Sequence, residues 1–213
     1  MFKTIVYISI CLLFQFAMSA CHSGQAGNHS TVVHTADSNI NPGHDTIKAT
    51  VAAKDKNEQT MDDGSVMDVH SSIAQNLSKS KNYSVFMGLV EKSVLYKTIG
   101  QKGALTIFAP VNSAFDKMDQ KTLSRLTSEA GKDDRDKFLK YYMIGGLLRS
   151  SDLTNGESLS TIEGDPLQVV ITNGKIKLGG GNGTSAEIVK GDILCNNGIL
   201  HLVDGVLMPK GMK

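Results

Sequence analysis

Residues 104–115 read ALTIFAPVNSAF, and this stretch sets the pattern for the folded part of the chain. The branched and aromatic run before Pro110 favours a strand, and Pro110 lacks the backbone N–H that would continue the ladder. Asn112 follows where a short polar side chain caps a helix, and Phe115 opens the apolar face of that helix. The stretch therefore predicts a strand, a turn and a capped helix, which together form a packing unit rather than a binding site.

An export signal is predicted over residues 1–21. Lys3 is the only charge, and an apolar run over residues 5–16 is too short to span a bilayer. Residues 18–21, MSAC, resemble the lipobox of bacterial lipoproteins, in which the cysteine becomes the acylated first residue. We expect lipidation of Cys21 and attachment to the membrane through the acyl chains. The alternative is an ordinary secretory peptide that is cut just before Cys21.

Residues 22–65 are predicted to be a disordered polar tether. Small polar and charged residues dominate there, aromatic residues are absent, and no helical or strand periodicity persists. The chain's histidines are concentrated in and just after this segment, but their irregular spacing predicts a solvated linker rather than a metal site. They are His22, His29, His34, His44 and His70.

The folded domain is expected over residues 66–213. Cys195 would be its only thiol once the signal is removed and Cys21 is acylated, so stability must come from a core rather than from disulfides. The net charge of the sequence is +1, and it has no tryptophan and no basic stripe, so we expect no nucleic-acid partner.

The periodicity of the domain changes along its length. Helical spacing of apolar residues predicts helices near residues 73–77, 83–99, 123–126 and 133–142. From residue 159 to 207, short alternating runs separated by turn signals predict strands instead. The Asn-Gly pairs at 173–174 and 197–198 predict hairpins with positive φ, and the glycines of 179–183 predict a long hairpin turn.

The final segment, NNGILHLVDGVLMP, together with residues 104–115, resembles the two characteristic segments of fasciclin-type FAS1 domains. The matching positions in the first segment are Thr106, Phe108, Ala109, Pro110, Ala114 and Phe115, with Asn112 in the same stretch. Those in the second are Asn197, Gly198, His201, Asp204, Val206, Leu207 and Pro209. The resemblance implies an α+β fold, a β-sandwich or wedge of about seven strands with several helices packed on one side, and a non-enzymatic role in adhesion.

Two sites of the FAS1 family can be carried across by this resemblance. A Tyr-His pair linked to adhesion in animal relatives corresponds to Tyr141 and Tyr142, where a tyrosine replaces the histidine. An Asp-Ile pair linked to integrin binding corresponds to Asp192 and Ile193. From the residues themselves, we expect the tyrosines to be mostly core aromatics, Asp192 to order a turn and Ile193 to be buried.

An enzymatic interpretation would require His201, Asp204 and a serine such as Ser113 to form a triad, without a nucleophile elbow or a metal motif to support it. We expect His201 to be a buried, hydrogen-bonded histidine instead, and we expect no cofactor. The sequence favours a non-catalytic, lipid-anchored FAS1 module of the bacterial envelope that binds a protein or glycan partner. The alternatives are a structural envelope protein that packs on a neighbouring component and a small-ligand carrier.

Overall fold

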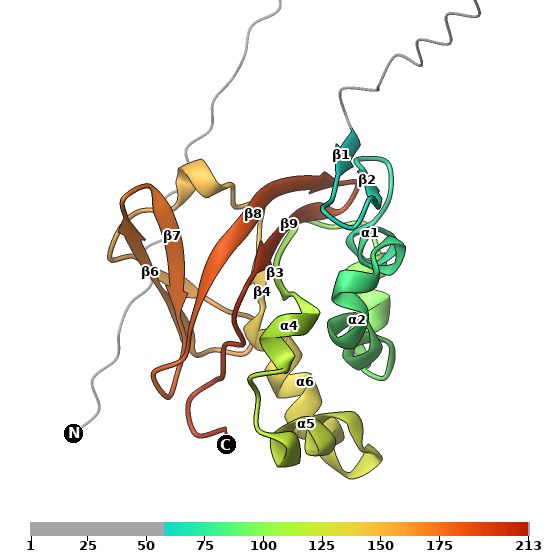
Figure 1. Cartoon of the computed structure of the whole chain (residues 1–213), viewed down its shortest axis with the longest axis vertical. Helices are drawn as coiled ribbons and strands as arrows, with labels where there is room; N and C mark the ends of the chain where they lie inside the picture. The colour runs from blue at the N-terminus through green and yellow to red at the C-terminus, as the bar shows by residue number, and fades with distance from the viewer. Residues whose placement is uncertain (1–57, 213) are drawn as a thin grey trace, which may run out of the picture. The chain divides into compact units, whose positions relative to one another are not determined.

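The computed structural model describes residues 58–212 (Figure 1). The predicted signal peptide, Cys21, most of the predicted tether and Lys213 lie outside these residues. The helices are α1 (Ile73–Lys79), α2 (Ser84–Glu91), α3 (Leu95–Gly100), α4 (Asn112–Phe115), α5 (Gln120–Thr127) and α6 (Lys132–Tyr141), with 3-10 turns η1 (Lys81–Tyr83), η2 (Glu129–Gly131) and η3 (Ser150–Asp152). The strands are β1 (Glu58–Thr60), β2 (Val66–Asp68), β3 (Leu105–Pro110), β4 (Met143–Gly145), β5 (Ser158–Ser160), β6 (Pro166–Thr172), β7 (Lys175–Gly179), β8 (Ser185–Cys195) and β9 (Gly198–Val203).

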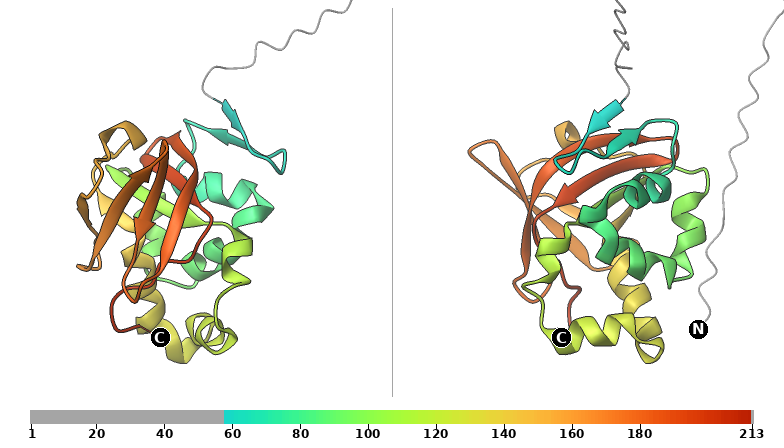
Figure 2. Two further views of the ribbon diagram at one scale, coloured as in Figure 1. Left: turned by 60° about the vertical axis from the view of Figure 1, so that its left-hand side comes forward. Right: turned by 45° about the vertical axis from the view of Figure 1, so that its right-hand side comes forward.

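Seven of the strands form one sheet in the order β4-β3-β9-β8-β7-β6-β5. The interior pair of β3 and β9 is parallel, and every other neighbouring pair is antiparallel. The hairpin of β6 and β7 diverges from the β3–β9 half, so the sheet has the shape of a wedge (Figure 1). The two edge strands are linked, because the Ile162 N–H, just after β5, bonds to the Met143 carbonyl in β4. The helices lie on one side of the β3–β9 half (Figure 2). The predicted α+β class with seven strands is confirmed.

The buried interior lies between this sheet and the helices. All six residues of β3 and all six of β9 are buried, as expected for central strands covered on both faces. An aromatic group joins the two layers: the Tyr142 ring lies 5.6 Å from that of Phe86 and 5.0 Å from that of Phe138. Such offset and edge-on ring pairs add specific geometry to the area that they bury.

The two predicted Asn-Gly hairpins differ in the structure. Asn173 and Gly174 both have positive φ, 52° and 77°, and connect β6 to β7 as predicted. At the second site, Cys195 pairs with Gly198, so the turn is formed by residues 196–197 and Gly198 is the first residue of β9. Gly198 is required there by close packing, because a Cβ atom would lie 2.0 Å from the Leu105 carbonyl oxygen.

The N-terminal boundary of the fold lies earlier than the sequence predicted. β1 and β2 form an antiparallel hairpin, with Glu58 opposite Asp68. Residues 58–65 are therefore part of the folded structure rather than of the tether, which we predicted to extend to residue 65. The polarity that suggested disorder belongs to the hairpin turn: the Asp63 carboxylate accepts hydrogen bonds from the Ser65 and Ser80 hydroxyls. The hydrogen bond from Ser65 is the largest cause, followed by that from Ser80, and together they lower the pKa of Asp63 to about 2.

Among residues 58–212, no helix is long and apolar enough to cross a membrane.

Candidate functional site

The two segments that carry the family resemblance lie side by side at the centre of the sheet. β3 and β9 pair in register, with Phe108 opposite His201 and Pro110 opposite Val203. Phe108 and Ala109 on β3 are fully buried, and so is His201 on β9. Beyond the strands, Phe115 on α4 and Pro209 are buried as well. Most of the matched residues therefore build the interior of the domain, whereas Asp204 is exposed and Val206 is half-buried.

His201 is buried with both ring nitrogens occupied. Its Nδ1 accepts a hydrogen bond from the Asp192 N–H at 3.3 Å, which leaves Nε2 as the protonated nitrogen that donates to the Leu148 carbonyl at 2.8 Å. The ring stacks on Phe108 with a centroid distance of 5.1 Å. Burial lowers the pKa of His201, because the charged imidazolium would lose its hydration there.

The predicted Asp-Ile pair lies in an irregular part of β8. The pairing of β8 with β9 shifts register between Lys190 and Ile193, and Asp192 there has a positive φ of 58°. Its carboxylate accepts hydrogen bonds from the N–H and hydroxyl of Ser150, which joins the bulge to η3. Partial burial alone would raise the pKa of Asp192, but these bonds and the nearby His201 outweigh it and lower the pKa. Ile193 is buried, as expected.

Tyr141 and Tyr142 are both fully buried. The Tyr142 hydroxyl accepts from the Leu207 N–H at 2.7 Å and donates to the Leu207 carbonyl at 3.0 Å, so it fixes the segment after β9. The Tyr141 hydroxyl accepts from the Gly181 N–H at 3.0 Å and donates to the Pro166 carbonyl. Burial raises the pKa of both phenols.

The four residues carried across as a possible binding site therefore do not form a binding surface. Tyr141, Tyr142 and Ile193 are buried, and the Asp192 carboxylate is bound to Ser150. In this structure the four side chains offer a partner little accessible surface, so we place the proposed partner contacts elsewhere. Their hydroxyl and carboxylate groups hold loops in place instead.

Three further motif residues with polar side chains also connect elements. Thr106 donates to the Gly146 carbonyl at 2.8 Å and accepts from the Leu148 N–H at 2.9 Å. The side-chain oxygen of Asn197 accepts a hydrogen bond at 2.9 Å from the N–H of Ile73, the first residue of α1. Asp204 accepts from the N–H of Glu187 in β8 at 2.7 Å.

Asn112 corrects one expectation. It does not cap its own helix: α4 begins at Asn112 after Val111, which makes no side-chain cap. Its side-chain oxygen accepts instead from the Val85 N–H at 3.0 Å, in the first turn of α2, while its amide donates to the Lys81 carbonyl at 2.8 Å. The prediction that Asn112 caps the helix that follows it is therefore wrong; its side chain bonds to the start of α2, which is distant in sequence.

The alternative triad is not assembled. His201 bonds to Leu148 and Asp192, Asp204 bonds to Glu187, and Ser113 is exposed in α4 without a bond to either residue. The three side chains are not hydrogen-bonded to one another. Within residues 58–212, no group of three or more His, Cys, Asp or Glu side chains is placed to hold a metal ion.

Arg135 was not recognised from the sequence as a structural residue, yet it is only 1% exposed on α6. Its guanidinium donates to the carbonyls of Leu126 at 3.2 Å, Ser128 at 3.0 Å and Lys92 at 2.8 Å. These carbonyls lie at the C-terminal ends of α5 and α2, where unpaired oxygens and the helix dipole favour a positive charge. Arg135 thus ties three helices together.

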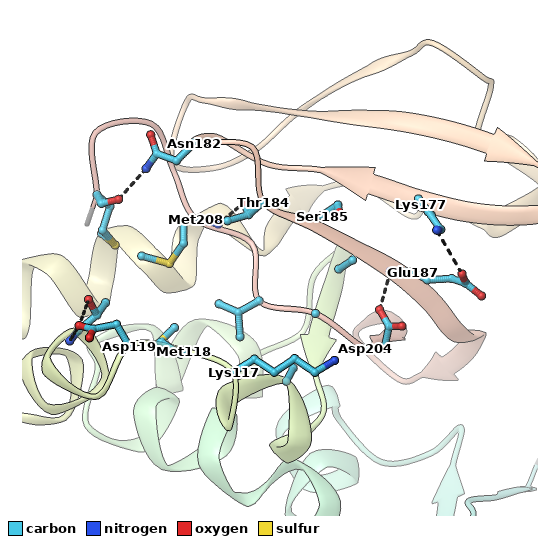
Figure 3. Close-up of a pocket in the computed structure, with 16 residues that line it drawn as sticks. Lys117, Met118, Asp119, Lys177, Asn182, Thr184, Ser185, Glu187, Asp204 and Met208 are labelled. Atoms are coloured by element: carbon cyan, nitrogen blue, oxygen red, sulfur yellow. Dashed lines mark hydrogen bonds and ion pairs between the residues drawn. The ribbon is translucent and has the colours of Figure 1, made fainter.

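A cleft of about 550 Å³ opens between the sheet and the α4–α5 connection (Figure 3). Met118 and Asp119 lie on the helical side, Thr184 lies on the opposite side at the start of β8, and Met208 lies between them (Figure 3). Buried Met212 also lines it. We call this the methionine cleft, because three methionines line it with Ala114, Ala186 and Val206.

The rim of the methionine cleft carries charges of both signs. Lys117 and Lys177 are exposed there, together with the carboxylates of Asp119, Glu187 and Asp204. The Glu187 carboxylate lies 3.9 Å from the Lys177 ammonium (Figure 3). An apolar, flexible floor beneath a mixed polar rim suits a ligand that has both apolar and charged groups. Ala114, Asp204 and Val206 were noted as motif positions, but the cleft itself could not be found from the sequence, since its walls come from three separate segments.

The fasciclin domain family model matches residues 81–209, more than half of the chain. The chain belongs to the fasciclin domain family. The matched FAS1 region begins at η1 and ends just after β9, so it includes both central strands.

Similar proteins include the bacterial Protein sll1483 of Synechocystis sp., 26% identical over 137 residues, which cover 64% of this chain and 73% of that protein. Human periostin is 28% identical over 145 residues, 68% of this chain but only 17% of periostin. Among solved structures, a FAS1 domain pair from the insect cell adhesion molecule Fasciclin I superposes with a TM-score of 0.58 at 16% identity, covering 65% of this chain and 51% of that one. This last likeness shows the fold.

Proposed function

We propose that this protein is an exported, lipid-anchored FAS1 module of the bacterial envelope that binds a partner without catalysing a reaction. The observation that carries the binding role is the methionine cleft. Unbranched thioether side chains such as those of Met118 and Met208 adapt to different apolar shapes, and methionine-rich surfaces are used by proteins that bind polypeptides.

A protein segment fits this cleft better than a glycan does. The rim carries both ammonium and carboxylate groups, exemplified by Lys117 and Asp204, so it complements a chain that has side chains of both signs. The floor offers Met208, Met212 and Val206 to apolar side chains. The solved FAS1 pair of the cell adhesion molecule Fasciclin I supports an adhesive role for this module.

The proposal of a non-catalytic role rests on the polar residues of the two motifs. His201, the only buried titratable base among them, uses both ring nitrogens to hold the bulge of β8 and the loop that contains Leu148. Such a histidine has no nitrogen left to accept a proton from a substrate.

The anchor is tested by metabolic labelling with an alkyne fatty acid. The wild-type protein should be labelled and should fractionate with membranes, whereas Cys21→Ala should be unlabelled and released. A wild-type protein without label would contradict lipidation. Protease treatment of intact cells then distinguishes the two membrane faces, because an outward-facing domain would be digested and an inward-facing one protected.

The binding site is tested by in-cell photo-crosslinking. A benzophenone amino acid is placed at Met118, in the cleft, and in a separate variant at Val170, which is exposed on β6 outside it. We expect a discrete protein adduct from the Met118 position and none from Val170. Equal adducts from both positions, or none from Met118, would contradict a partner in the cleft and favour the alternative of a structural envelope protein that packs through another face.

A further inference from the structure

A second cleft lies between α1, α3 and the turn that joins β8 to β9. Its volume is about 850 Å³, larger than that of the methionine cleft, and its walls come from residues 71–79, 96–102 and Asn196. We call it the α1–α3 cleft. It shares no residue with the methionine cleft, so whatever it binds is a separate question from the function proposed above.

The frame of the α1–α3 cleft is fixed by two asparagines of the β8–β9 turn. The Asn197 amide donates to the carbonyls of Ile99 and Gln101, both at 2.8 Å, at the C-terminal end of α3. The Asn196 side chain donates to the His70 carbonyl at 2.7 Å, just before α1. The turn therefore holds the two helices at a set separation, which gives the cleft a defined shape before any ligand arrives.

The charge of this cleft has one sign. Lys79, Lys97 and Lys102 line it, and none of its lining residues within the described part of the chain is an aspartate or glutamate. The Lys79 ammonium bonds to the Ser71 hydroxyl at 3.0 Å. The exposed Lys97 and Lys102 form no hydrogen bond or ion pair within residues 58–212. Lys79 also lies within electrostatic reach of the Asp68 carboxylate, which does not line the cleft, so the positive charge of the cleft comes mainly from Lys97 and Lys102 and favours an anionic ligand.

The other lining groups favour a carbohydrate. Tyr96 is 46% exposed, so it offers an aromatic ring and a hydroxyl to a ligand at the wall of the cleft. The Gln101 side chain is exposed and makes no hydrogen bond within residues 58–212, and the amide nitrogen of Gln75 is likewise unused there. An amphipathic aromatic ring beside amides that can both donate and accept suits the apolar face and hydroxyl groups of a sugar.

We propose that the α1–α3 cleft binds an acidic glycan, a polysaccharide whose sugars carry carboxylates or other anionic groups. The lysines pair with its charges, Tyr96 packs against a sugar ring, and Gln75 and Gln101 bond to its hydroxyls. An envelope module with this cleft would hold an acidic polysaccharide at one surface and a protein partner at another.

The test titrates the full chain carrying Cys21→Ala, which keeps it in solution, with a hexamer of galacturonic acid followed by calorimetry. We expect saturable binding that weakens about tenfold in Lys97→Gln/Lys102→Gln, weakens several-fold in Tyr96→Ala and declines with added salt. The matched control is Lys117→Gln/Lys177→Gln in the methionine cleft, which removes the same charge and should leave binding unchanged.

Three results would overturn the proposal. The first is no saturable binding of the acidic hexamer by the parent protein, or equal binding of neutral maltohexaose. The second is equal weakening by the two lysine pairs, which would indicate nonspecific attraction. The third is binding to phosphatidylglycerol vesicles but not to the hexamer, which would identify the cleft as a membrane-surface contact. All substituted side chains are exposed, and unchanged thermal unfolding should verify that each variant is folded.

Discussion

Replacing His201 with phenylalanine tests how the central strand pair is held in place. Phenylalanine can keep the stacking contact with Phe108, but it cannot accept from the Asp192 N–H or donate to the Leu148 carbonyl. Each unpaired, partly buried group costs about 1–3 kcal/mol, and the more apolar ring recovers part of this. We therefore expect His201→Phe to lower the free energy of unfolding by about 2 kcal/mol at pH 7.5.

The same variant should also change the dependence of stability on pH. The pKa of His201 is below its ordinary value in the folded protein, so between these two values the unfolded chain binds a proton that the folded chain does not. The free energy of unfolding of the wild type should therefore fall as the pH drops below about 6.5, by up to about 1.4 kcal/mol per pH unit. This contribution is absent in His201→Phe. Carboxylates with lowered pKa, such as Asp63, lose their contribution only at more acidic pH.

The assay is urea unfolding followed by far-ultraviolet circular dichroism, since the chain has no tryptophan. With an m value of about 2 kcal/mol per molar, the midpoint should fall by about 1 M at pH 7.5. The difference between wild type and variant should then shrink between pH 6.5 and pH 5.5. The reasoning is refuted if the two midpoints agree at pH 7.5, or if both proteins lose the same stability over that pH interval.

Three other substitutions test separate parts of the structure by the same unfolding assay. Arg135→Met leaves three helix-end carbonyls without their donor and should cost about 3 kcal/mol, whereas Lys132→Met on the exposed start of the same helix should change stability by less than about 0.5 kcal/mol. Gly198→Ala places a Cβ atom 2.0 Å from a backbone oxygen of β3 and should prevent stable folding, while Gly145→Ala, which meets nothing within 4 Å, should be tolerated. Tyr142→Phe removes both hydroxyl bonds to the segment after β9 and should cost about 1–3 kcal/mol. Similar stability of Arg135→Met and Lys132→Met, a normally folded Gly198→Ala or an unchanged Tyr142→Phe would each contradict the corresponding assignment.

Strands β3 and β6 could be predicted because their signals are local. An apolar run that ends at Pro110 fixes β3, and the alternation of Leu167 and Val169 with exposed neighbours fixes β6. The prediction failed where a residue acts at a distance. Asn112 lies at the start of a helix, so its position predicts that it caps this helix. Its side chain instead bonds to Val85, because α2 packs beside it. Sequence spacing alone does not reveal that contact.

The clefts were harder to predict for the same reason. The methionine cleft joins the α4–α5 connection, the start of β8 and the segment after β9, and only the folded sheet brings these together. For Tyr141 and Tyr142, the resemblance to the family suggested a binding role, but both side chains are buried in the structure. The burial of Arg135 could not be predicted from its position in the helix, since a charged residue in a helical pattern usually lies on the solvent side.

These observations separate what makes the domain fold from what it binds. Thr106, Asn197 and His201 satisfy backbone groups of loops with buried side chains, whereas Asp204 bonds to the Glu187 N–H from the exposed rim of the methionine cleft. Residues of this kind preserve a fold among proteins whose surfaces differ. We therefore look for the proposed partner at the methionine cleft, to whose lining three motif positions contribute, namely Ala114, Asp204 and Val206.

The most direct test of this account measures binding of the fluorescently labelled Cys21→Ala protein to envelopes from cells that lack it. We predict saturable binding that is lost in Met208→Lys, which places a charge in the methionine cleft, and that persists in Val170→Lys on the exposed face of β6. Digestion of the envelopes with protease should abolish it. No saturable binding, or equal binding by the two lysine variants, would contradict the claim that this FAS1 module recognises an envelope protein through the methionine cleft.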